Sequence, residues 1–134
     1  MSDESRVLAG ILLLALVTVE TGGLYMVKLV RGKAEATPFQ LAFARAGHAH
    51  AGVLLILALV CQLMADDAGL AGLWNWLARS GVAVAALLMP GGFFFSSIGR
   101  GRERPNALIA LVFTGAVVLA LGLASLGVGL LTAG

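Results

Sequence analysis

The chain has 134 residues, of which 60% are hydrophobic and 12% are charged, and its mean hydropathy is +0.99. Soluble globular domains have about 45–50% apolar and about 25% charged residues, so this composition excludes a soluble domain and indicates an integral membrane protein. The pI of about 9.2 does not indicate nucleic-acid binding, because the basic residues flank apolar segments and form no soluble basic patch.

Four apolar segments are predicted to cross the bilayer, because a membrane helix needs about 20 mainly apolar residues and the chain leaves room for little else. These spans are residues 7–30, 38–64, 73–98 and 106–131. The connections between them are short, so consecutive spans should be antiparallel. We expect a single domain over residues 1–134, an all-α, up-down four-helix bundle in the membrane.

The charges of the connections predict the orientation of these spans. The first and third connections are basic, with Lys28, Arg31, Lys33, Arg100, Arg102 and Arg104. The second connection has Asp66 and Asp67 instead, and the N-terminal tail is net acidic. By the positive-inside rule, both termini and the acidic connection should lie outside the plasma membrane.

Glu20 in the first span and Arg45 in the second are charged residues at lipid depth. At 1.5 Å per residue, Arg45 lies about 10 Å and His48 about 15 Å from Pro38, and Glu20 falls between them in depth. An arginine or aspartate at the centre of a spanning helix costs about 2.5–3.5 kcal/mol on insertion scales. We therefore expect Glu20 to pair with Arg45, His48 or both.

The segment "RAGHAHAG" places both histidines of the chain, His48 and His50, in the second span. Residues two apart on a helix differ by about 200°, so the two rings should face different neighbours. Arg45 and His48, three apart, share a face. These groups either set the helix register by pairing within the bundle or form a metal or haem site, with His48 and His50 as candidate iron or copper ligands.

Two residues of the third span are further candidates for binding a cofactor. Arg79 could pair with a haem propionate, or it could extend its side chain to the headgroups. Met89 could be a second axial ligand, as could Met26 in the first span, or Met89 could simply pack beside the kink expected at Pro90.

The fourth span has no charged residue but has glycines at intervals of seven, Gly115, Gly122 and Gly129. Small residues in a stripe let another helix approach closely. That helix could belong to the same bundle or to a second copy of the chain. The stripe is therefore compatible with a homo-oligomer, which is also favoured because one of the two oppositely directed histidines could face a second bundle.

The run "FARAGHAHAGVLLILAL", about twenty residues, resembles the (G/A)-H-A-H-x-x-x-x-G signature of small bacterial membrane proteins related to subunit I of haem-copper and cbb3-type oxidases. The residue four after His50 is Leu54 where that signature has glycine, and the chain has no histidine outside this span. The resemblance implies haem binding through His48 or His50 and a location in the bacterial inner membrane. It does not imply an oxygen-reducing haem-copper centre, which needs histidines from several helices.

The leading hypothesis is a haem-binding membrane protein, b-type, that transfers electrons or senses a small ligand, with quinone as a conceivable partner. The site residues would be His48, His50, Arg45, Arg79 and Met89, with Glu20 as the buried charge partner. One alternative is a copper or other transition-metal protein that uses His48, His50 and Glu20. Another is an accessory subunit of a respiratory membrane complex. The sequence leaves open whether the protein is an enzyme, for example a haem oxidoreductase.

Overall fold

The computed structural model describes residues 1–133, and within this range all regular secondary structure is helical. The helices are α1 (Asp3–Val30), α2 (Pro38–Ala65), α3 (Gly72–Ser96), the short 3-10 helix η1 (Ala107–Ile109) and α4 (Ala110–Thr132). Four of the helices in the described range are long and apolar enough to cross a membrane. The predicted all-α membrane fold is confirmed, and the chain is a multi-pass membrane protein.

The observed helices begin and end close to the predicted spans. The largest differences are four residues, at Asp3 against residue 7 and at Ala110 against residue 106. α1 begins early because the Ser2 side chain accepts a hydrogen bond from the backbone N–H of Ser5, which satisfies one of the free donors of the first turn. Polar capping residues, rather than the first apolar residue, therefore decide where this helix starts.

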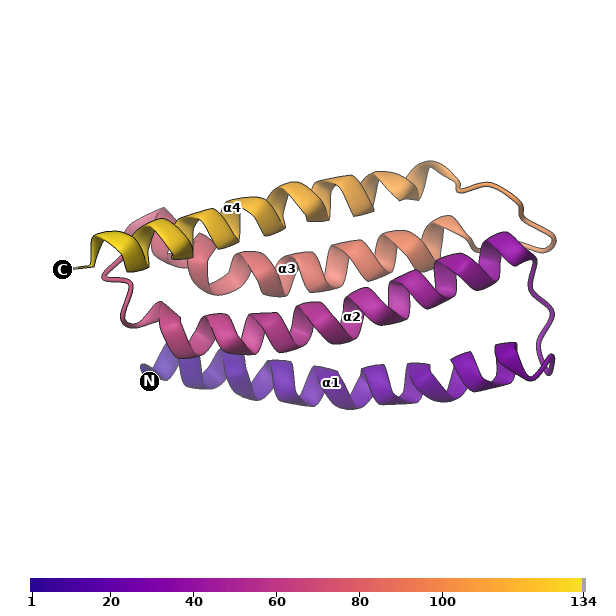
Figure 1. The fold of residues 1–134 in the computed structure, drawn as a ribbon, viewed down its shortest axis with the longest axis horizontal. Helices are drawn as coiled ribbons and strands as arrows, with labels where there is room; N and C mark the ends of the chain where they lie inside the picture. Colours follow the sequence, from indigo (N-terminus) through magenta and orange to yellow (C-terminus); the bar gives the residue numbers. More distant parts are fainter. Residues whose placement is uncertain (134) are drawn as a thin grey trace.

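The four long helices run up and down in chain order (Figure 1). α1 packs on α2, α2 on α3, and α3 on α4, whereas α2 and α4 share only a small contact. Figure 1 also places the N-terminus and the last turn of α4 at one end, together with the connection between α2 and α3. We call this the acidic end, and the opposite end, with the connections 31–37 and 97–106, the basic end. The predicted up-down bundle is confirmed, with α1 and α4 as its outer helices.

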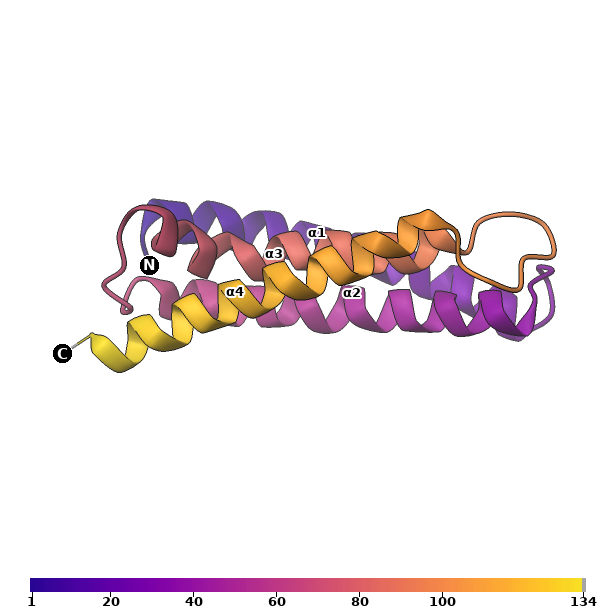
Figure 2. The same cartoon turned by 90° about the horizontal axis from the view of Figure 1, so that it is seen from above.

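α4 crosses α3 obliquely (Figure 2), and glycines on both helices allow the approach. A Cβ atom on Gly81 would lie 2.8 Å from the Cα of Gly122, and one on Gly129 would lie 2.8 Å from the Leu70 side chain. Gly115 faces α3 in the same way, at Leu88. The glycine stripe of the fourth span is therefore used inside the chain, and it supplies no free surface for a second copy.

The core lies mainly between α2 and α3 and consists of small and aliphatic side chains. Its most enclosed members include Leu54, Ala58, Cys61, Ala78 and Val82. The outward faces of the helices carry large exposed apolar side chains, most of all on α1. This distribution suits a chain surrounded by lipid, in which the outer surface stays apolar and helices associate by close packing.

Candidate functional site

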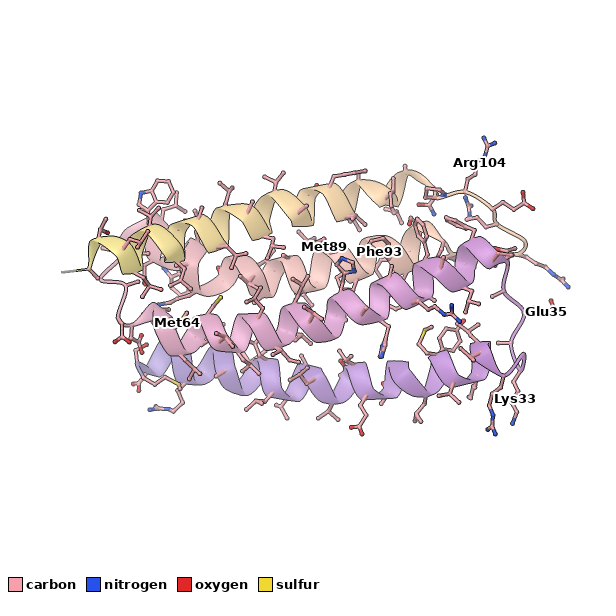
Figure 3. The ribbon with its side chains drawn as sticks, viewed as in Figure 1. Lys33, Glu35, Met64, Met89, Phe93 and Arg104 are labelled. Carbon is pink, nitrogen blue, oxygen red and sulfur yellow. The ribbon has the colours of Figure 1, made fainter. Side chains whose placement is uncertain are left out.

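The two histidines lie on opposite faces of α2, as their spacing predicted. His48 packs against the glycine pair of α1: a Cβ atom on Gly22 would lie 3.4 Å from its Nδ1, and one on Gly23 would lie 3.6 Å from its Cε1. His50 faces α3, where its ring centroid is 5.0 Å from that of Phe93. Figure 3 labels Phe93 on α3, with Met89 one turn before it. The two imidazoles therefore cannot bind one metal ion within the chain.

The His50 ring has a defined tautomer. Its Nδ1 lies 2.7 Å from the carbonyl oxygen of Ala46, one turn earlier in α2. A carbonyl oxygen only accepts, so Nδ1 must carry the proton, and in the neutral ring Nε2 keeps its lone pair. Metal-binding histidines are commonly oriented in this way, by a backbone carbonyl on the nitrogen that does not bind the metal.

His50 also lines a small apolar cavity. The cavity has a volume of about 160 Å³, and its other walls are Ala49, Val53 and Leu54. Small-molecule pockets usually enclose about 300–1,000 Å³, so this cavity is too small to enclose a macrocycle. A flat ligand at His50 would need a second surface to cover it.

His48 is held by packing, without a hydrogen bond to another residue in the described range 1–133. Its ring lies beside the two glycines, at distances where a Cβ atom on either one would make ordinary van der Waals contact with it. Small residues at these positions let α1 and α2 pack closely at this level. His48 is therefore packed between α1 and α2 at lipid depth and has less freedom to receive a flat ligand than His50 has.

The predicted pairing of Glu20 with Arg45 or His48 is wrong. Both Glu20 and Arg45 are exposed, and no ion pair joins Glu20 to either partner within residues 1–133. α1 contacts α2 through the face that contains Val19, Gly22 and Gly23. Each residue turns a helix by about 100°, so Glu20 is rotated off this face. Depth along the helix, from which the pairing was inferred, does not fix the face on which a residue lies.

Arg79 is buried, with 6% of its surface exposed, and its guanidinium forms hydrogen bonds with other residues of the chain. Its Nη2 donates to Asp66 Oδ1 at 2.7 Å, its Nε donates to Asn75 Oδ1 at 2.9 Å, and its Nη1 donates to the Ser5 hydroxyl. Arg79 thus extends toward the acidic end, the direction considered for headgroup contact, but its guanidinium is buried and paired with protein groups. Its pairing with a propionate stays a prediction, and it would have to compete with this network.

Asp66 joins the N-terminus of α1 to this network. Its Oδ2 accepts the backbone N–H of Ser2 at 2.6 Å, and its Oδ1 accepts the Ser5 hydroxyl at 3.1 Å. The hydrogen bond from Ser2 and the one from Arg79 hold the pKa of Asp66 far below its ordinary value. We call Ser2, Ser5, Asp66 and Arg79 the acidic-end clamp. The sequence analysis missed it, although an arginine and an aspartate at the same end of neighbouring spans were a signal for such a pair.

Met89 is buried between α3 and α4. A Cβ atom on Gly115 would lie 2.5 Å from the Met89 side chain, so the methionine fills the space that this glycine leaves. α3 continues as a helix through Pro90. Met26 is half-buried on α1. The placement of Met89 matches a packing role, and axial ligation by Met89 or Met26 stays a prediction.

The side chains of the described range form no cluster of three or more histidine, cysteine, aspartate or glutamate residues that could hold a metal ion. The proposed copper set of His48, His50 and Glu20 is not brought together, because the histidines face opposite helices and Glu20 is exposed on α1. A ligand that needs only one imidazole from this chain suits the geometry better.

No protein-family model matches this chain, and no curated protein or solved structure matches it either. The resemblance to oxidase-related membrane proteins stays a prediction that rests on the His48–His50 segment.

Proposed function

We propose that this chain is a haem-binding membrane protein, with haem b held by the Nε2 atom of His50, that transfers electrons or binds a small ligand. The observation that supports this proposal is the hydrogen bond from His50 Nδ1 to the carbonyl oxygen of Ala46, which leaves Nε2 able to coordinate iron. A bound haem would supply one-electron chemistry or an open iron position for a small molecule.

The proposal includes a second copy of the chain, because the cavity of about 160 Å³ beside His50 cannot enclose a haem by itself. A haem at the lipid-facing side of α2 would be covered when the same surface of another protomer meets it. The His50 residue of that protomer would then help to hold the haem. Ala49 next to His50 and the exposed Val53 leave space for a flat, apolar ring there.

The absorption spectrum of the purified full chain, expressed with haem supplied, tests the proposal. The wild-type protein should have a Soret band, and His50→Ala should remove it. His48→Ala is the matched control and should keep the band, because His48 packs against α1. His50→Met should shift the spectrum through the changed ligand. Colourless wild-type protein, or loss of the band only in His48→Ala, would overturn the assignment.

A second candidate function, an accessory subunit of a larger membrane complex, is supported by Glu20 and Arg45. Each is exposed at lipid depth without an ion-pair partner among residues 1–133, and uncompensated charge there is costly. A neighbouring subunit with opposite charges would remove this cost. Mild solubilisation from native membranes followed by mass spectrometry should then recover a stoichiometric partner, which Glu20→Gln and Arg45→Gln should weaken.

A further inference from the structure

The basic end contains a cavity of about 430 Å³ between the connections 31–37 and 97–106. Residues from both connections and from the start of α2 form its walls; they are Glu35, Ala36, Thr37, Gln40, Gly99, Arg100 and Gly101. Its volume lies within the range of about 300–1,000 Å³ typical of small-molecule sites. Figure 3 labels Glu35 at this end of the bundle, with Lys33 and Arg104 on either side of it.

Hydrogen bonds between the two connections hold the walls of this cavity in place. Gln40 Nε2 donates to the carbonyl oxygens of Ser97 and Gly99, at 2.9 and 2.7 Å. The Thr37 hydroxyl donates to the carbonyl oxygen of Arg102 at 2.6 Å and accepts the backbone N–H of Gln40. The polar groups of Thr37 and Gln40 are thus satisfied by the protein, and the cavity exists without a ligand.

Glu35 and Arg100 are the two charged residues of these walls, and neither forms an ion pair within the described residues 1–133. Arg100 stands between Gly99 and Gly101, whose φ angles of +128° and +63° turn the chain sharply at this point. The cavity therefore has one negative and one positive side chain, and its wall charges cancel.

A second cavity of about 280 Å³ borders the first and reaches between the helices. The two share Glu35, Ala36, Gln40 and Gly99, and the second adds apolar and aromatic groups from α1, α2 and α3, among them Tyr25, Leu29, Ala44 and Phe94. The polar, zwitterionic cavity thus adjoins one that shares Glu35 and Gln40 and has apolar side chains of the helices among its other walls.

We propose that these adjoining cavities bind a phospholipid whose headgroup has both a phosphate and a primary ammonium group, as in phosphatidylethanolamine. Arg100 pairs with the phosphate, Glu35 accepts hydrogen bonds from the ammonium group, and the glycerol end enters the cavity beside Tyr25 and Leu29. The proposal does not depend on haem binding.

The wall charges favour this headgroup over a purely anionic one. A third cavity, of about 630 Å³, lies beside Arg100, Arg102, Glu103 and Arg104 and has an excess of positive charge that would suit any anionic headgroup. In the 430 Å³ cavity, by contrast, Glu35 would repel a headgroup with negative charge alone. The quaternary ammonium of phosphatidylcholine has no N–H donor for Glu35.

Native mass spectrometry of the delipidated full chain tests the proposal by comparing adducts with phosphatidylethanolamine, phosphatidylcholine and phosphatidylglycerol at equal concentration. We expect phosphatidylethanolamine to exceed each of the others by about 1.5- to fivefold, the range that a partly exposed ion pair contributes. Glu35→Gln should abolish this preference, and Arg100→Gln should lower the adducts of all three phospholipids at this site.

Glu103→Gln and Arg104→Gln are matched controls for Glu35→Gln and Arg100→Gln. Each removes one negative or one positive charge at the basic end, from a residue that does not line the 430 Å³ cavity. They should keep the preference for phosphatidylethanolamine. Equal or greater binding of phosphatidylglycerol, or equal effects of Glu35→Gln and Glu103→Gln, would overturn the proposal. Displacement of the lipid by soluble O-phosphoethanolamine at equal concentration would instead assign the cavity to a soluble phosphate ester and overturn the lipid assignment.

Discussion

Gly81 on α3 and Gly122 on α4 meet backbone to backbone: a Cβ atom on Gly122 would lie 3.0 Å from the Cα of Gly81. Because the atoms in the way belong to the main chain, a larger residue cannot be accommodated by turning a side chain. The helices would have to separate, and the contacts on either side of the crossing would be lost with them.

Gly122→Leu should therefore destabilise the bundle by about 1–3 kcal/mol, the usual cost of overpacking a fitted interface. Gly127→Leu is the control, since a Cβ atom on Gly127 meets nothing within 4 Å and its position on α4 is exposed. Thermal unfolding in detergent micelles measures both variants. Equal melting temperatures for the two would contradict the close crossing of α3 and α4.

The acidic-end clamp should make the stability depend on pH in the acid range. The pKa of Asp66 is lowered in the folded chain, so its stabilising effect is complete above the ordinary aspartate pKa of about 3.9 and is lost as the pH falls toward the folded-state value. The melting temperature of the wild-type protein should fall below about pH 4. Asp66→Asn should be less stable at neutral pH and should lose part of this acid dependence.

Asp67→Asn is the matched control for that measurement. Asp67 is exposed, and its side chain has no ion pair within residues 1–133. Its variant should follow the wild-type curve of melting temperature against pH. An Asp67→Asn curve that matched the Asp66→Asn curve would show that the clamp does not join α1 to α3.

Replacing Glu20 should ease the insertion of α1 into a bilayer, because this carboxylate is exposed at lipid depth in the isolated chain. Glu20→Leu should favour insertion by about 3–4 kcal/mol, judged from the insertion cost of a charged residue at a helix centre and the favourable insertion of leucine. A translocon-based insertion assay of α1 measures the change, with Glu20→Gln as an intermediate case. Unchanged insertion of Glu20→Leu would indicate that this charge costs little at its position in the membrane.

The two basic connections should lie on one side of the membrane, opposite the acidic connection. Cysteines introduced for Lys33 and Arg104 should react with an impermeant thiol reagent only from the cytoplasmic side, and one for Asp67 only from outside. The buried Cys61 is first replaced by serine to give an unreactive background. Labelling of the Asp67 position from the cytoplasm would reverse the predicted orientation.

Composition and apolar run length were enough to predict the number of spans, their antiparallel order and the opposite directions of His48 and His50. These features depend on local properties: a bilayer requires about 20 apolar residues per helix, and a helix turns by about 100° per residue. The start of α1 was less predictable, because capping by Ser2 depends on a hydrogen bond in the polar tail.

The tertiary structure decided which residues meet. Glu20 and Arg45 have compatible depths, yet helix rotation separates them, whereas Arg79 and Asp66 lie close because α3 returns beside the end of α2. The glycines of α4 could have packed against a second chain, but Gly115 and Gly122 pack against α3, and Gly129 packs against the connection before it. Sequence determined how each helix forms and how deep each residue lies, since both follow from short-range geometry. The rotation of each helix about its own axis and the order in which the helices pack depend on all interfaces together. Only the tertiary structure therefore shows which charged residues pair and which small residues lie at helix contacts.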